Sequence, residues 1–308
     1  MGEAMRLIVM GQQAFGKGVL DALLERGEDV VAVYCAPDKE GRPVDPLKEA
    51  ALARGLPVHQ PASYKDPDAL AEMRALKPDL CLMAYVTMFV PEDAREIPTH
   101  GSICFHPSLL PLHRGPSSIN WPIIGGATKT GLTLFYPNDG LDEGDILLQK
   151  EVDIGPDDTL GTVYFNKIFG LGVQAMCEAV DLFREGRATR TPQDTSKATY
   201  ESWCREADAE IDWTKPVAEV YNLIRGTNPQ PGAWTTCRGK TLQIFDAARI
   251  DGADGAPGEV MAVSDAGIEI AAGGGRIRAK RVRPKGEGKM TAAEFAAKEG
   301  LSVGARLG

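Results

Sequence analysis

The chain has 308 residues, of which 43% are hydrophobic and 25% charged, and this composition excludes a disordered or fibrous protein. At roughly 100–200 residues per domain, the length suits two domains or one large one. No apolar run reaches the about 18 residues of a membrane helix, and the N-terminus lacks a hydrophobic signal segment. We therefore expect a cytoplasmic protein with no membrane partner.

The cysteines are dispersed and form no CxxC pair, which argues against a zinc site and against a disulfide scaffold. We expect free thiols and no bound metal. The six positions are Cys35, Cys81, Cys104, Cys177, Cys204 and Cys237.

The net charge of −9 is unevenly distributed. Residues 1–205 contain 20 Lys and Arg against 29 Asp and Glu, whereas residues 206–308 contain 14 of each. The acidic first part argues against a general polyanion-binding surface there. A cationic cluster in the second part could contact phosphates, although a solvated strand face is the commoner explanation for such a run. The cluster comprises Arg276, Arg278, Lys280, Arg281, Arg283, Lys285 and Lys289.

Strand and helix patterns alternate through the first half of the chain. In chain order, we expect a strand at 6–10, a helix at 15–24, a strand at 30–34, a helix at 46–54, a strand at 57–59, a helix at 67–76 and a strand at 80–84. This βαβ order predicts an α/β fold with a doubly wound, Rossmann-like parallel sheet. Another strand is expected at 131–136, and a long helix at 159–185 ends before Gly186.

The composition changes after this helix. Residues 189–199 are polar and contain Pro192, which predicts a linker. Beyond residues 217–224, short strands at 241–245, 258–263 and 267–270, separated by glycines and Asp-Gly turns, predict a small β-barrel, OB-like domain. We expect two domains, at residues 1–200 and 206–308.

The segment Gly11–Lys17 reads GQQAFGK and resembles the start of a phosphate-binding loop, with a strand before it and a helix after it. Gly18 occupies the position where a Ser or Thr hydroxyl would bind magnesium, which argues against nucleotide hydrolysis. A strand-to-helix turn that requires glycine is the favoured interpretation.

A histidine and an acidic turn follow two expected strands. The apolar strand 103–105 delivers His106 to a turn at Pro107, and the strand 131–136 is followed by the carboxylate-rich run NDGLDEGD at 138–145. If the strands are neighbours, a carboxylate of the turn can face the imidazole. Such a pair fixes the histidine tautomer and raises its basicity, while a solvated loop or helix cap explains the spacing equally well.

The run FHPSLLPLHRG at 105–115, followed by DGLDEGD at 139–145, resembles the signature of the 10-formyltetrahydrofolate-dependent formyltransferase family. Members include methionyl-tRNA formyltransferases, sugar-amine formyltransferases and the hydrolase domain of 10-formyltetrahydrofolate dehydrogenase. The resemblance extends into the C-terminal domain through IDWTKP at 211–216, RGTNPQPGAW at 225–234 and GKMTAAEF at 288–295.

Within this family, four sequence segments are most similar to the hydrolase domain of the dehydrogenase. The segments that carry this likeness are APDKEGRPVDPL at 36–47, HGSICFHPSLLP at 100–111, SSINW at 117–121 and DILLQKEVDIGPDDTL at 145–160. Methionyl-tRNA formyltransferases tend to carry a longer, basic insertion after the second strand, whereas this loop is short and balanced in charge.

The resemblance implies catalytic roles for His106 and Asp142. Cys104 stands where the transferases have an Asn that donates a hydrogen bond to the developing oxyanion, and a thiol is a poor donor. The dehydrogenase's hydrolase domain also lacks this Asn, so Cys104 favours hydrolysis over transfer. A nucleophilic role for Cys104 is conceivable beside an imidazole, although a buried, inert cysteine is more common.

The resemblance also implies a folate site that binds 10-formyltetrahydrofolate as the formyl donor, without a metal. Its expected walls are the segment Ala84, Tyr85, Val86, Met88 and Phe89 and the turn Asn138, Asp139, Gly140 and Asp142, with a lip of Ser108, Leu109, Leu110, Pro111 and Arg114. Packing roles remain open for Phe89 and Leu109.

The expected activity is cleavage of the formyl group by water, giving tetrahydrofolate and formate. One alternative is transfer to an amine, with methionyl-tRNA or an amino sugar nucleotide as partner, which the cationic cluster at 276–289 supports. A non-catalytic folate-binding protein is a second alternative, against which His106 and Asp142 argue, since binding a pterin requires neither.

Overall fold

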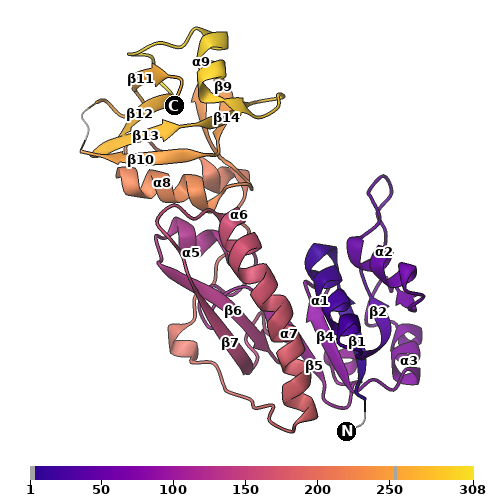
Figure 1. The fold of residues 1–308 in the computed structure, drawn as a ribbon. Helices are drawn as coiled ribbons and strands as arrows, with labels where there is room; N and C mark the ends of the chain where they lie inside the picture. Colours follow the sequence, from indigo (N-terminus) through magenta and orange to yellow (C-terminus); the bar gives the residue numbers. More distant parts are fainter. Residues whose placement is uncertain (1–3, 253–254) are drawn as a thin grey trace. The chain divides into compact units, whose positions relative to one another are not determined.

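The computed structural model describes residues 4–252 and 255–308, and their contacts form two compact units (Figure 1). The first unit comprises residues 1–115, 131–151 and 167–200, and the second comprises 116–130, 152–166 and 201–308. The units interleave along the chain, and a division into domains at 1–200 and 206–308 stays a prediction from the sequence. No helix within the described ranges is both long and apolar enough to cross a membrane.

A seven-stranded sheet forms the centre of the first unit, in the order β3-β2-β1-β4-β5-β6-β7. Its strands are β1 (Arg6–Gly11), β2 (Asp29–Tyr34), β3 (Val58–His59), β4 (Leu80–Ala84), β5 (Ser102–His106), β6 (Lys129–Phe135) and β7 (Ile146–Asp153). The first five strands pair in parallel, which confirms the predicted α/β fold.

At one side the sheet departs from the parallel arrangement, because β6 pairs antiparallel with β5. An apolar strand carries no signal for its direction, and an antiparallel strand beside a parallel sheet is common. Strand β7 was not predicted at all. Its side chains alternate between partly covered and exposed, so it lacks the continuous apolar run of the buried strands.

Helices cover both faces of the sheet, as the doubly wound prediction requires. They are α1 (Gln13–Glu25), α2 (Pro46–Ala53), α3 (Pro67–Ala75), α4 (Glu92–Arg95) and α7 (Phe169–Arg184). On one face Phe15 of α1 packs on Phe105, with ring centroids 4.2 Å apart, and on Phe169 of α7 at 5.7 Å. On the other face Met73 of α3 and Ala94 of α4 belong to a separate apolar cluster. Burial on both sides explains why β1, β2 and β4 are almost uniformly apolar.

The long helix expected at 159–185 is helical throughout but not uniform. It consists of α6 (Leu160–Val163), a π-helical turn (Tyr164–Ile168) and α7. Thr159 begins it with a capping box, in which its hydroxyl accepts from Thr162 N–H and Thr162 accepts from Thr159 N–H.

The C-terminal part of the second unit has two four-stranded antiparallel sheets, in the orders β10-β13-β12-β11 and β15-β14-β9-β8. Ile224, Ile244, Ile270, Ile277 and Phe295 belong to one buried core between them and the helices. This arrangement confirms the predicted small antiparallel β domain. Its elements are α8 (Val217–Gly226), β8 (Ala233–Cys237), β9 (Lys240–Ile244), β10 (Ala247–Asp251), β11 (Val260–Ser264), β12 (Gly267–Ala272), β13 (Gly275–Ala279), β14 (Arg281–Pro284), β15 (Met290–Thr291) and α9 (Ala292–Glu299); α5 (Asn120–Ile124) also belongs to the second unit.

The register of the parallel strands aligns their carboxyl ends at one edge. Gly11 pairs with Ala84 across β1 and β4, and Met83 pairs with Cys104 across β4 and β5. Open α/β sheets bind ligands at this edge. His106, the last residue of β5, therefore lies where a ligand is expected.

Gly11 allows the close approach of β1 to β4 at this edge, because a Cβ there would lie 1.9 Å from the carbonyl oxygen of Ala84. We expect Gly11→Ala to lower the free energy of unfolding by about 1–3 kcal/mol, as overpacking does. Urea denaturation measures this. Gly170→Ala in α7, whose Cβ would have open space, is the matched control and should raise stability by about 0.5–1 kcal/mol.

Candidate active site

His106 is buried at the end of β5 and faces Asp142 of the acidic turn. The Nε2 atom of His106 lies 2.8 Å from the carbonyl oxygen of His113, so Nε2 carries the proton and donates. The other ring nitrogen, Nδ1, lies 3.6 Å from Asp142 Oδ2. That separation is too long for a direct hydrogen bond. Oδ2 instead accepts from the Gly115 backbone N–H at 2.8 Å.

Burial and charge act in opposite directions on this histidine. Desolvation lowers the pKa of His106 below its usual value near 6.5, whereas the charge of Asp142 and the hydrogen bond to His113 raise it. Desolvation is the larger effect. The imidazole is therefore neutral at pH 7, with an unprotonated Nδ1 directed at the carboxylate.

Cys104 lies two residues before His106 and thus on the same face of β5. It is half-buried and packs against the apolar cluster that contains Met83. Desolvation strongly raises the pKa of the Cys104 thiol, and the nearby charge of Asp142 raises it further. A thiol that stays protonated is a weak nucleophile, so this environment favours the inert cysteine over the nucleophile.

The acidic turn is held by a glutamine that sequence reasoning missed. Gln193 Nε2 donates to the carbonyl oxygens of Asp142 at 2.8 Å and Gly144 at 2.7 Å. Its Oε1 accepts from Arg114 Nη2 at 2.9 Å, while Arg114 Nη1 lies 3.3 Å from Glu143 Oε1. These contacts hold Asp142 in a left-handed backbone conformation with φ of 54°.

The segment 189–199 is therefore not the free linker that its composition predicted. Thr191 exchanges two backbone hydrogen bonds with Ile146, and Thr199 binds the backbone of Pro111 and Arg114. Two of its polar side chains also bind backbone groups, since Gln193 donates to Asp142 O and Gly144 O and the Thr199 hydroxyl accepts from His113 N–H. Composition alone does not distinguish such a segment from a linker.

The loop after His106 is largely buried and hydrogen-bonded within the fold, and its expected role as the lip of the folate site stays a prediction. Ser108 and Leu110 are buried, and the Ser108 hydroxyl donates to Leu112 O at 2.7 Å. Arg114 is also buried and binds Gln193 and Glu143. Leu109 and Pro111 are half-buried.

The segment after β4 is more open. Ala84 is buried, but Tyr85 and Phe89 are exposed, and Phe89 retains 58% of its accessible surface. The alternative of a core role for Phe89 is therefore wrong. Val86 and Met88 are half-buried and pack against the cluster beneath them.

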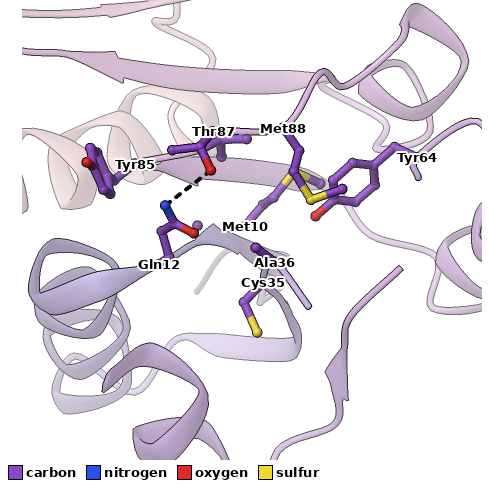
Figure 2. Close-up of a pocket in the computed structure, with 10 residues that line it drawn as sticks. Met10, Gln12, Cys35, Ala36, Tyr64, Tyr85, Thr87 and Met88 are labelled. Carbon is purple, nitrogen blue, oxygen red and sulfur yellow. Dashed lines mark hydrogen bonds between the residues drawn. The ribbon is translucent and has the colours of Figure 1, made fainter. Parts of the chain in front are cut away.

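A small pocket opens between this segment and the ends of β1 and β2 (Figure 2). Gln12 Nε2 donates to Thr87 Oγ1 across it at 3.2 Å. It lies where the strand order reverses, between β1 and β4, which is the usual ligand position in such sheets. The expected wall 138–142 is not part of its lining. The lining residues are Met10, Gly11, Gln12, Cys35, Ala36, Tyr64, Tyr85, Val86, Thr87 and Met88.

The beginning of the acidic turn has two further ties. Asn138 Oδ1 accepts from the Gly140 N–H at 3.0 Å, and Asp139 Oδ1 lies 2.8 Å from Arg95 Nη2. Asn138 and Gly140 thus shape the turn locally, and Asp139 connects it to α4. Among the described residues, no group of three or more His, Cys, Asp and Glu side chains is arranged to hold a metal ion.

We expect Gln193→Glu to weaken the hold on the acidic turn. A carboxylate can still accept from Arg114, but it has no N–H for the carbonyls of Asp142 and Gly144. Leaving these groups without their donor should lower the free energy of unfolding by about 1–3 kcal/mol, measured by urea denaturation. Gln243→Glu is the control for the same chemical change, because the Gln243 amide donates to Pro231 O at 3.1 Å in the second unit. An effect at residue 193 no larger than at residue 243 would contradict this role.

We expect Asp142→Asn to lower the pKa of His106 further. The carboxylate raises that pKa, so its removal leaves desolvation less opposed and shifts protonation to lower pH. Titration of the ring nitrogens by ¹⁵N NMR measures the change. Asp145→Asn, in the same turn, should leave the titration near its wild-type midpoint; a fall only in the Asp145 variant would refute the assignment.

Comparison with known proteins supports the family suggested by these motifs. The Formyl transferase model matches residues 5–180, and the Formyl transferase, C-terminal domain model matches residues 204–300. A methionyl-tRNA formyltransferase of Geobacter metallireducens is 37% identical over 309 residues, covering 99% of each chain. Cytosolic 10-formyltetrahydrofolate dehydrogenase of Mus musculus is 40% identical over 267 residues, which are 85% of this chain and 30% of the relative.

The fold is also similar to that of solved formyltransferases. An N-formyltransferase from Helicobacter canadensis, solved with folinic acid and dTDP-3-aminofucose, has a TM-score of 0.69 and covers 89% of this chain and 98% of its own, at 19% identity. At that identity the likeness concerns the fold alone. From the matched models and the full-length relative, the chain belongs to the formyltransferase family and is an enzyme.

Proposed function

We propose that this enzyme cleaves 10-formyltetrahydrofolate with water as the formyl acceptor. The observation that carries the proposal is the arrangement of His106 Nδ1 and Asp142 Oδ2, which lie 3.6 Å apart without bonding each other. One water molecule at hydrogen-bond distance from both atoms would fit this separation. Asp142 would orient the water, and the unprotonated Nδ1 would accept its proton.

The water oxygen then attacks the formyl carbon as the proton moves to Nδ1. The carbonyl oxygen becomes an oxyanion, and the imidazolium beside Asp142 is the nearby positive charge that stabilises it. Collapse of the tetrahedral intermediate breaks the bond between the formyl carbon and N10 of the folate. The nitrogen takes the proton from His106, and tetrahydrofolate leaves with formic acid, which loses its remaining proton to solvent to become formate.

The proposed folate site offers apolar side chains to a flat heteroaromatic ring. Tyr85 and Phe89 are exposed on the segment after β4, and Leu141 is exposed on the acidic turn beside Asp142. Exposed large apolar side chains are typical of ligand sites. The contacts of Asn138, Asp139 and Gly140 with the ligand remain part of this proposal.

Water is favoured over an amine by the environment of Cys104. An amide at this position would donate a strong hydrogen bond to the oxyanion, whereas the desolvated thiol of Cys104 is a weak donor. All six cysteines are free thiols, which suits the reducing cytoplasm that we include in the proposal.

Methionyl-tRNA is the second candidate acceptor, because a methionyl-tRNA formyltransferase matches this chain over its full length. The cationic cluster is partly neutralised, since Glu269 pairs with Arg276 at 3.2 Å and with Arg278 at 2.7 Å. Lys289 and Arg283 lie over the Phe245 ring, at 3.7 Å and 5.4 Å from its centroid. Phosphate binding requires concentrated, available cations, so this pairing weakens the tRNA alternative. An amino sugar acceptor rests on the shared fold alone.

The deciding experiment follows formate and tetrahydrofolate after the enzyme is given 10-formyltetrahydrofolate alone, with charged initiator tRNA, or with amino sugar nucleotides. We expect formate without any acceptor, and a loss of about 10²–10⁴-fold in His106→Ala and Asp142→Asn. Cys104→Ala should retain turnover, because the thiol is not the nucleophile.

Turnover that depends on an added acceptor would contradict the hydrolase proposal and indicate a formyltransferase. Tight folate binding without turnover would indicate a binding protein. Loss of all turnover in a folded Cys104→Ala variant would restore the covalent role.

A further inference from the structure

Arg95 of α4 is a buried cation that the proposed chemistry does not use. Only 5% of its side chain is exposed. Its Nη1 donates to Val90 O at 2.7 Å, and its Nη2 donates to Asp139 Oδ1 at 2.8 Å. Buried charges are retained where they are paired and hydrogen-bonded, so this residue requires an explanation.

The two partners of Arg95 belong to the two proposed walls of the folate site. Val90 ends the segment after β4 that carries Tyr85 and Phe89, and Asp139 begins the turn that carries Leu141 and Asp142. One planar guanidinium therefore spans from one wall to the other. Its backbone is anchored as well, because the Arg95 carbonyl accepts from Ser102 Oγ of β5 at 2.9 Å.

The pair is asymmetric in its exposure. The Asp139 side chain is 71% exposed, whereas Arg95 is enclosed. The Arg95 Nε atom is buried and has no hydrogen-bond partner within the described part of the chain. The buried partner is thus Arg95 on α4, and the solvent-exposed carboxylate of Asp139 binds to it.

Resting on the proposed function, we propose that Arg95 and Asp139 form a clasp that holds the two walls of the folate site together. Arg95 is then a positioning residue: it sets the distance from the segment after β4 to the acidic turn, and through that turn the place of Asp142. Gln193 secures the far end of the same turn, and the clasp secures its beginning.

The clasp predicts that folate binding depends on the pair and not on either residue separately. Tetrahydrofolate affinity would be measured by calorimetry, together with kcat and KM for formate release, in the full chain. We expect Asp139→Asn to weaken affinity about tenfold, as loss of a charge-assisted hydrogen bond does, and Asp139→Glu to restore most of it.

A double-mutant cycle isolates the pair. In Arg95→Leu, addition of Asp139→Asn should cause no further loss, because the partner is already absent. Asp93→Asn removes an exposed carboxylate from the same helix and should leave affinity unchanged. The unfolding free energy is measured in parallel, so a lower affinity at unchanged stability distinguishes positioning from general support.

The outcomes separate this inference from the proposed function. Unchanged affinity in the exposed-site variant Asp139→Asn, or additive losses in the cycle, would overturn the clasp while leaving the hydrolase in place. If the wild-type chain bound no tetrahydrofolate and released no formate, both would be overturned. The conclusion does not depend on Arg95→Leu folding well, since Asp139→Asn changes only a solvent-exposed side chain.

Discussion

The burial of His106 at the carboxyl end of β5 is the constraint on which the rest of the site depends. An imidazole removed from water resists protonation, yet proton transfer requires it to become charged during the reaction. A carboxylate near Nδ1 reduces the cost of that charge, while the His113 carbonyl holds the other nitrogen. The position of Asp142 is therefore as important as its presence.

Asp142 lies on a turn rich in carboxylates, which repel one another and would not remain in place unaided. Cations and hydrogen-bond donors from other parts of the chain stabilise the turn. Arg114 pairs with Glu143, Arg95 pairs with Asp139, and the Gln193 amide donates to two carbonyls of the turn. Partly buried charges interact more strongly than exposed ones because water and salt screen them less. The turn is thus held at both ends, with Asp142 between them.

The sequence predicts much of the fold because its strongest signals are local. Apolar runs and helical spacing place β1, α1, β2, α3 and β4 within a residue or two, and the Gly-rich turns mark the second unit. Strand direction and pairing are not local, which explains why the antiparallel β6 was unexpected and the half-exposed β7 unnoticed. The pairing of His106 with the acidic turn does not follow from the neighbouring strands alone, because β6 runs antiparallel and its last residue, Phe135, pairs with Cys104.

The supporting residues of the site could not be found in the same way. Gln193 is 51 positions from Asp142, and Arg95 is 44 positions from Asp139. Neither belongs to a motif, and each stands in a segment whose composition suggests a loop or a surface helix. Their roles depend on the finished fold, which brings the Gln193 amide to the carbonyl groups of the acidic turn and the Arg95 guanidinium to the Asp139 carboxylate. The small pocket beside Gln12 was missed for a related reason, since its lining comes from four separate parts of the chain, at or after the ends of β1, β2, β3 and β4.

Cys104 depends both on a local sequence pattern and on contacts that only the finished fold provides. It follows the alternation of β5, so its place beside His106 is dictated by the strand, whereas its chemistry is dictated by burial. In a polar setting a thiol next to an imidazole would be a nucleophile; here desolvation and the charge of Asp142 keep it protonated. The same carboxylate that favours the charged form of His106 thus disfavours the thiolate. Burial thus keeps the thiol protonated, with the charge of Asp142 adding to the effect, and in the proposed reaction the imidazole is the group that changes protonation as water attacks.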